Sequence, residues 1–257
     1  MLPVMEQKPR QRDRRIIPRV QEKTRNKKVT IAAGFCCTNG IVLCADRQFT
    51  TSGLYKYHDK KIITETGDAW SATFAFSGSP VFADEIRQKV VVVLNQKHAD
   101  EIRAPYVQEV LDDVLTSTSR LYISGEIELQ LLVGLAVLFE SPELLHFDGR
   151  ALRIVENGCA YVGGGETSIV RYLSDLLYSP SLSTAEASSL AAYLVKKTEQ
   201  YVDGVGGPID VVVLNSFGEC EWLPEATINE RITRIEKRER QIFDLLIRQP
   251  SASSNEP

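Results

Sequence analysis

The sequence has few cysteines, and none of them stands in a spacing typical of a metal site or a disulfide framework. The five cysteines are scattered, no Cys-x-x-Cys pair occurs, and Cys36 and Cys37 are adjacent in an apolar run. Adjacent residues of a strand point to opposite faces, so these two thiols would not face each other. We therefore expect reduced thiols and no metal, as in a cytoplasmic protein.

Long hydrophobic runs are also absent. The longest, Leu131 to Phe139, is well short of the roughly 18 residues that a membrane-spanning helix needs. The first residues contain no apolar core of the kind found in a secretory signal. We expect a cytoplasmic protein without a membrane partner.

Two widespread motif classes are missing as well. Gly163, Gly164 and Gly165 stand together, but neither a G-x-G-x-x-G nor a G-K-[ST] motif occurs, which argues against a nucleotide cofactor. The histidines at 58, 98 and 146 belong to no common motif, and no G-x-S-x-G occurs. A Ser-His-Asp triad is therefore not expected, and neither is a cofactor.

Basic and acidic residues are unevenly distributed along the chain. Residues 1–29 contain ten Lys or Arg and three Asp or Glu, which leaves 20 basic and 31 acidic residues in the remainder. Because residues 1–28 also contain three prolines and few apolar side chains, they are predicted to be a disordered basic extension or pro-segment. Such an arm could bind nucleic acid, but we do not expect a nucleic-acid partner.

What the sequence does contain is a regular order of strands and helices. A hairpin is predicted at residues 30–45 around Thr38-Asn39-Gly40, because Asn-Gly is the strongest short-range hairpin signal. A polar loop is predicted over Phe49–Tyr57. Further strands are predicted at 61–66, 71–77, 128–139, 144–148, 152–155, 160–162, 209–214 and 219–222, and helices at 81–97, 105–119, 163–178, 184–202 and 225–248.

This order predicts the fold class. Strands linked by hairpins, with helices grouped between them, indicate an α+β fold in which two antiparallel sheets stack between outer helices. The domain is expected to span residues 29–248, and residues 249–257 are predicted to be a polar, disordered tail.

A threonine, an aspartate and a lysine follow one another along the first strands. Thr30 opens the hairpin, Asp46 ends it, and Lys60-Lys61 opens the next strand. Over about residues 29–222 the chain resembles the proteasome-type members of the N-terminal-nucleophile (Ntn) hydrolases. The motifs that carry the resemblance are VTIAAGF, NGIVLCAD, AFSGSPVFADEIRQKV, YVGGGE and VDGVGGPIDVVVL.

The resemblance implies a four-layer αββα sandwich and a beta-type or stand-alone bacterial proteasome-like protein. It also implies a threonine-type peptidase that hydrolyses polypeptides through an acyl-enzyme, without a metal or cofactor. Relatives of this kind assemble into rings, so a homo-oligomeric ring or a proteasome-like assembly is expected. The helix pair at 81–119 would supply the contacts.

The resemblance also assigns roles to residues. Thr30 would be the nucleophile and its own α-amine the base, since an amine with a pKa near 8 suits a general base. Lys61 would lower the pKa of that amine, and Asp46 would hold Lys61 charged. Gly78 would supply the oxyanion hole, and Asp203 is close to the family's supporting aspartate.

Several positions depart from the family pattern. Its two serines are replaced by Gly164 and by Val205 or Gly206. The loop after Asp46 is one residue short, so Lys60 remains an alternative to Lys61.

Exposure of the Thr30 amine is the main difficulty. Val29, a β-branched residue, precedes Thr30 where the family usually has a glycine, and this disfavours self-cleavage. One hypothesis is that Val29 corresponds to a GTG start codon, so that removal of methionine leaves Thr30 first. Two other functions stay open, a catalytically silent scaffold subunit with an uncleaved arm and an Ntn amidase of small amides.

Overall fold

A computed structural model of the chain describes residues 30–51, 55–121, 129–156, 158–163 and 168–247. The predicted basic extension and the predicted polar tail lie outside the described residues. In the part of the chain that is described, none of the helices has the length and apolar character needed to cross a membrane.

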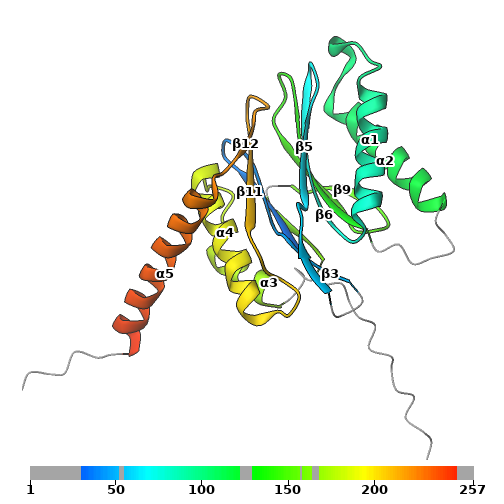
Figure 1. Ribbon diagram of the computed structural model, residues 1–257. Coiled ribbons are helices and arrows are strands. Elements are labelled where there is room, and N and C mark those ends of the chain that lie inside the picture. Colours follow the sequence, from blue (N-terminus) through cyan, green and yellow to red (C-terminus); the bar gives the residue numbers. More distant parts are fainter. Residues whose placement is uncertain (1–29, 52–54, 122–128, 157, 164–167, 248–257) are drawn as a thin grey trace, which may run out of the picture.

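Two five-stranded antiparallel sheets form the centre of the protein (Figure 1). The first has the strand order β10-β1-β2-β11-β12, and the second runs in chain order from β5 to β9. The strands of the first sheet are β1 (Ile31–Cys37), β2 (Gly40–Asp46), β10 (Cys159–Gly163), β11 (Ile209–Asn215) and β12 (Cys220–Trp222). Those of the second are β5 (Ile62–Thr66), β6 (Trp70–Ser77), β7 (Gln130–Val137), β8 (Glu143–Phe147) and β9 (Leu152–Ile154).

Helices cover the outer face of each sheet, so the predicted four-layer α+β sandwich is confirmed (Figure 1). One outer layer lies on the second sheet and the other on the first. The second sheet carries α1 (Pro80–Leu94) and α2 (Ala104–Leu121), which are linked by a short 3₁₀ turn at Ala99–Glu101. The first sheet carries α3 (Ser168–Leu177), α4 (Thr184–Tyr201) and α5 (Glu225–Ile247). A capping box formed by Ser183 and Glu186 opens α4.

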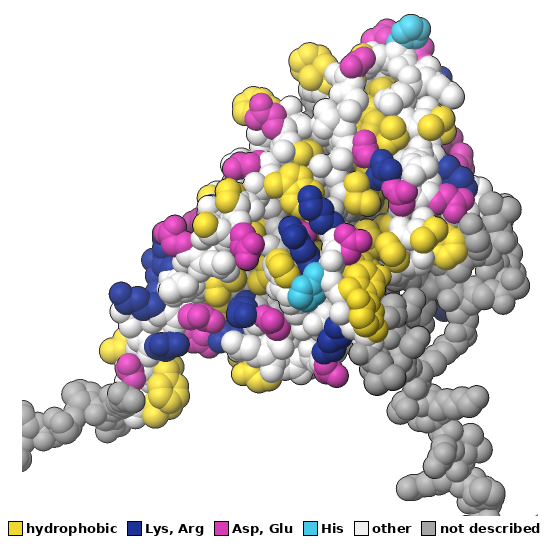
Figure 2. All heavy atoms as spheres, in the orientation of Figure 1, with side chains coloured by type: hydrophobic (Ala, Val, Ile, Leu, Met, Phe, Trp, Pro, Cys, Tyr) yellow, Lys and Arg dark blue, Asp and Glu magenta, His cyan; other side chains and the backbone are white. Residues whose placement is uncertain are grey.

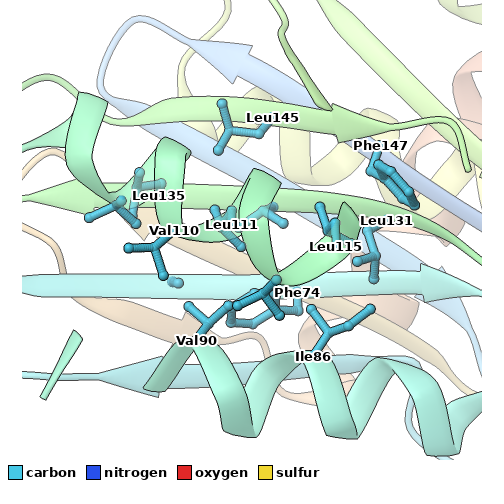
Figure 3. Packing of buried hydrophobic residues seen from close by; sticks show 14 of the residues in the cluster. Phe74, Ile86, Val90, Val110, Leu111, Leu115, Leu131, Leu135, Leu145 and Phe147 are labelled. Atoms are coloured by element: carbon cyan, nitrogen blue, oxygen red, sulfur yellow. The ribbon is translucent and has the colours of Figure 1, made fainter. Parts of the chain in front are cut away.

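Three hydrophobic clusters fill the spaces between the four layers. One lies between the second sheet and its helices, where Phe74 and Leu131 meet Ile86 and Leu115 (Figure 3). Another lies between the two sheets, and the third lies between the first sheet and its helices. Because both faces of each sheet are covered, the central strands are nearly continuous apolar runs, and every residue of β2 is buried.

The predicted hairpin turn is present and connects the sheet to a helix. β1 ends at Cys37 opposite Gly40, the first residue of β2. Gly40 has a φ of +149°, and a Cβ atom there would overlap the backbone oxygen of Leu214 on β11. The side-chain oxygen of Asn39 accepts a hydrogen bond of 2.8 Å from the N–H of Thr184, at the start of α4.

Two predictions about loops and strand ends were wrong. The segment predicted as a polar loop over Phe49–Tyr57 forms a small hairpin of β3 (Gln48–Thr51) and β4 (Tyr55–His58). Aromatic residues stabilise it, since the rings of Phe49 and Tyr57 stack with 5.2 Å between centroids. The strand predicted over 128–139 is β7, which ends at Val137, and Phe139 lies beyond it with a φ of +67°.

We expect Gly40→Ala to lower the free energy of unfolding by roughly 2–4 kcal/mol, because the new Cβ would strain the backbone and displace β11. Urea denaturation would measure the change. Gly158→Ala is the matched control, because the nearest atoms to a Cβ there are 3.5 Å away and the change should be nearly neutral. Equal losses in both variants would contradict the role given to the turn.

Candidate active site

The carboxylate of Asp46 lies at the centre of a fully buried polar cluster. Its Oδ1 accepts hydrogen bonds from the backbone N–H of Ile31, at 3.0 Å, and from Lys61 Nζ, at 2.7 Å. Its Oδ2 accepts hydrogen bonds from the N–H groups of Gln48 and Gly206, both at 3.1 Å. Each carboxylate oxygen therefore has two donors. Through these four hydrogen bonds, the Asp46 side chain connects four separate segments of the chain.

Lys61 is the buried partner of this carboxylate. Its side chain is 0% exposed, and Nζ lies 2.7 Å from Asp46 Oδ1 and 2.5 Å from the carbonyl oxygen of Gln48. The ring of Phe49 lies under the ammonium, with Nζ 4.8 Å from the ring centroid. Since Asp46 ends a strand of the first sheet and Lys61 precedes a strand of the second, the pair connects the two sheets.

Burial and charge pairing shift the pKa of each member of the pair in opposite directions. Burial raises the pKa of the Asp46 carboxyl, while Lys61 and the N–H groups of Ile31 and Gly206 pull it down. Burial lowers the pKa of the Lys61 ammonium, and Asp46 opposes that change. A lysine whose pKa is lowered in this way is typical of functional sites.

Thr30 lies directly beside this pair. Its residue is 5% exposed, and the next backbone N–H, that of Ile31, is one of the four donors to Asp46. On its other side it meets Gly163, the last residue of β10, which has a φ of +79°. A Cβ atom at Gly163 would overlap the carbonyl oxygen of Thr30 and would come within 2.6 Å of Ser77 Oγ. Only glycine allows the three segments to approach so closely.

Gly78 follows Ser77 at the turn from β6 into α1. It has a φ of +117°, and the next residue, Ser79, is the N-cap of the helix without a side-chain capping bond. The first N–H groups of a helix have no partners within the helix and favour negative charge. Because Ser77 lies against Gly163, and Gly163 against Thr30, this turn lies close to the threonine.

The structure separates the two candidate lysines. Lys61 contacts Asp46, whereas Lys60 is exposed and lies over the ring of Trp222, with Nζ 4.5 Å from the centroid. Successive residues at the start of a strand point to opposite sides, and this explains the difference. Lys61 is therefore the lysine that fits the predicted role.

Asp203 lies apart from the cluster. Its side chain is 96% exposed and forms an ion pair of 3.2 Å with Lys56, which is also exposed. The contact with Asp46 comes instead from the backbone of Gly206, three residues later. Of the positions that replace the family's serines, Val205 is buried and Gly164 lies outside the described residues.

Two glutamines belong to the site and were missed in the sequence. Gln48 binds both members of the buried pair through its backbone, and its side-chain oxygen lies 3.1 Å from where a Cβ of Gly206 would be. Gln130, at the start of β7, accepts a hydrogen bond of 2.6 Å from the N–H of Gly163. Each is the first residue of its strand, and that position in the sequence alone gave no indication of these contacts.

The cluster can orient a lysine ammonium beside a threonine and present backbone donors nearby. It offers no set of metal ligands, and within the described ranges no three His, Cys, Asp or Glu side chains gather in a way that could hold a metal ion. The chemistry that fits these groups is attack by a hydroxyl on a carbonyl carbon, with stabilisation of the resulting oxyanion.

Several solved structures share this fold. Anbu, described as an ancestral beta-subunit, from Yersinia bercovieri is 13% identical over 84% of this chain and 98% of its own, with a TM-score of 0.72. An Anbu mutant from Hyphomicrobium sp. strain MC1 is 16% identical over 84% of this chain and 97% of its own, with a TM-score of 0.70. The Anbu complex from Pseudomonas aeruginosa, solved as a helical assembly, is 16% identical over 87% of this chain and 100% of its own, with a TM-score of 0.66.

At these identities the likeness concerns the fold. No curated protein matches the sequence. The family model of the proteasome subunits, however, matches residues 27–214. That match extends over well more than half of the sequence, and the chain therefore belongs to the proteasome subunit family.

Proposed function

We propose that this protein is a threonine-type peptidase that cleaves polypeptides with Thr30 as its N-terminal nucleophile. The observation that carries the proposal is the fully buried Asp46–Lys61 pair next to Thr30. Burying an ion pair costs desolvation free energy, and well-packed apolar residues of similar size would stabilise a fold equally well or better. A pair that is held by four donors and lies beside a threonine is better explained by chemistry than by stability.

The reaction that these groups support has two halves. With a free amine on Thr30, the amine accepts the proton of the side-chain hydroxyl as Oγ1 attacks the peptide carbonyl. The C–N bond of the substrate breaks, the proton leaves with the amine product, and the acyl group remains on Oγ1 as an ester. Water then attacks the ester with the same amine as base, which releases the acid and restores Thr30.

The roles of the neighbouring groups follow from their positions. The positive charge of Lys61 lowers the pKa of the Thr30 amine by like-charge repulsion, so more of the amine is free to act as a base. Asp46 holds that ammonium in place through the contact at 2.7 Å. The turn at Gly78 supplies N–H groups for the oxyanion, a contribution whose loss typically costs about 100-fold or more in rate.

The mechanism requires that Thr30 become the first residue of the mature chain. Cleavage before Thr30, or translation from Val29 followed by removal of methionine, would produce that end. The relatives support an assembly as the working form, since the Pseudomonas aeruginosa Anbu complex is a helical assembly. A homo-oligomeric, proteasome-like enzyme is the corresponding proposal here, because an enclosed chamber restricts an unselective nucleophile to unfolded chains.

A catalytically silent assembly subunit is the second candidate. It is favoured by the exposed position of Asp203 and by the replacement of one of the family's serines by Val205 or Gly206. An Ntn amidase of small amides would use the same nucleophile. Intact mass and N-terminal sequence of protein from its natural host distinguish the silent subunit, and a panel of peptide and small-amide substrates distinguishes the two enzymes.

We expect Thr30→Ala to abolish hydrolysis of fluorogenic peptides by protein whose mature end is residue 30, a loss of at least about 1,000-fold. Thr30→Ser keeps the hydroxyl and the amine and should retain measurable activity. The mass of each preparation must first show the same N-terminus. Activity that survives in Thr30→Ala would show that another residue is the nucleophile.

We expect Lys61→Met to lower the free energy of unfolding by about 3–5 kcal/mol, because it leaves the buried Asp46 carboxylate uncompensated. The double variant Asp46→Asn/Lys61→Met removes both charges and should recover only part of that loss in urea denaturation, because the amide NH₂ faces at least one backbone N–H. It should still lack peptidase activity, because the charge that acts on Thr30 is gone.

Lys60→Met is the matched control for this series. Lys60 is exposed and its ammonium lies over the ring of Trp222, away from Asp46, so the substitution should change neither stability nor activity. A stable double variant with full activity would limit the buried pair to a structural role. A loss of activity in Lys60→Met would assign the catalytic role to Lys60 instead of Lys61.

A further inference from the structure

The groups of the candidate site come from both sheets. Thr30 directly precedes β1 of the first sheet, whereas Gly78 follows β6 of the second. The rate of attack depends on the separation of the nucleophile from the oxyanion donors, and a misplacement of about 1 Å can cost about 100-fold. The two sheets must therefore be held at a fixed separation at this edge.

Gln130, the first residue of β7, provides a polar link between the sheets. Its side-chain oxygen accepts the hydrogen bond of 2.6 Å from the N–H of Gly163, at the end of β10. β7 belongs to the second sheet and β10 to the first. The buried pair of Asp46 and Lys61 is another such link. Because β1 lies between β10 and β2, the two links are on opposite sides of the strand that Thr30 precedes.

The link made by Gln130 joins the neighbours of both reacting parts. On the first sheet, Gly163 lies so close to the carbonyl oxygen of Thr30 that a Cβ would overlap it. On the second sheet, Gln130 pairs with Ser77 across β7 and β6, and Ser77 directly precedes Gly78. A movement of Gly163 relative to β7 would therefore change the separation of Thr30 from the turn at Gly78.

Gly163 depends on this hydrogen bond for its position. It has a φ of +79° and no side chain with which to pack. Glycine also loses more conformational freedom on folding than any other residue. An N–H group withdrawn from water without an acceptor is costly, so without the oxygen of Gln130 the backbone at Gly163 would move toward another acceptor.

The two links differ from the ion pairs on the surface. Basic and acidic side chains are intermixed over the face of the molecule in Figure 2. Ion pairs between such exposed groups contribute little and are weakened by salt. The pair of Asp46 and Lys61 is fully buried, and Gln130 is half-buried, so both links act where water competes less.

We propose that Gln130 is a positioning residue that sets the distance between Thr30 and the oxyanion donors at Gly78. It acts through Gly163 and Ser77 and touches none of the reacting atoms. Its effect on rate rests on the proposed peptidase function. Its hold on the start of β1 does not, and this hold can be measured separately.

Peptidase kinetics of protein whose mature end is residue 30 test the effect on rate. Gln130→Met removes the acceptor at similar size, and kcat should fall by about 100-fold while KM changes by less than about threefold. Gln130→Glu keeps an acceptor oxygen and should retain most of kcat at high pH. Its negative charge raises the pKa of the Thr30 amine, so the rise of activity with pH should move to higher pH.

Gln108→Met is the matched control. Gln108 of α2 is also half-buried, and its side chain donates a hydrogen bond to the carboxylate of Glu143 on β8. Glu143 pairs with Leu135, five residues along β7 from Gln130. Loss of this bond should leave kcat, KM and the pH profile unchanged.

Amide hydrogen exchange measured by NMR gives a readout that needs no activity. In Gln130→Met, the Gly163 amide should exchange about tenfold faster. The Ile31 amide, which donates to Asp46, should follow it, because Ile31 pairs with Gly163 across β1 and β10. The Val133 amide, in the middle of β7, should be unchanged and so excludes a general loosening of the fold.

The outcomes separate this inference from the proposed function. An inactive wild type with Thr30 first would contradict the peptidase proposal, and the exchange rates would still decide whether Gln130 holds the start of β1. Full kcat in Gln130→Met, or faster exchange at Gly163 without a change at Ile31, would overturn the inference. Equal losses of kcat in Gln130→Met and Gln130→Glu at every pH would overturn it too. If Gln130→Met does not fold, as judged by circular dichroism, the pH profile of Gln130→Glu decides.

Discussion

The structure depends on one carboxylate in the space between two sheets. Asp46 has four donors, of which three are backbone N–H groups and one is a lysine ammonium. The backbone donors come from β1, from the start of β3 and from the segment before β11. A buried carboxylate with fewer partners would take up a proton or destabilise the fold, so the four segments must hold their positions together.

The antiparallel topology explains why the site forms at one edge. In such a sheet, the ends of some strands lie beside the starts of their neighbours. Asp46 and Gly163 end their strands, whereas Thr30 and Lys61 precede theirs, and all four lie at the same edge of the two stacked sheets. Residues far apart in the sequence therefore lie next to one another in the fold. The absence of a Cβ at Gly163 allows its close approach to the carbonyl oxygen of Thr30.

The sequence was sufficient for the fold and for part of the site. Asn39-Gly40 predicted the first hairpin, and the alternation of strands and paired helices predicted the four layers, because both are local patterns. The hairpin after Asp46 was predicted as a loop because the residues after Phe49 are polar. It is stabilised by stacked aromatic rings and not by an apolar face, so it has no alternating hydrophobic pattern. Spacing could not choose between Lys60 and Lys61, because the choice depends on which side of a strand faces the other sheet. The roles of Gln48 and Gln130 could not be predicted either, since they arise from the positions of backbone groups on distant segments.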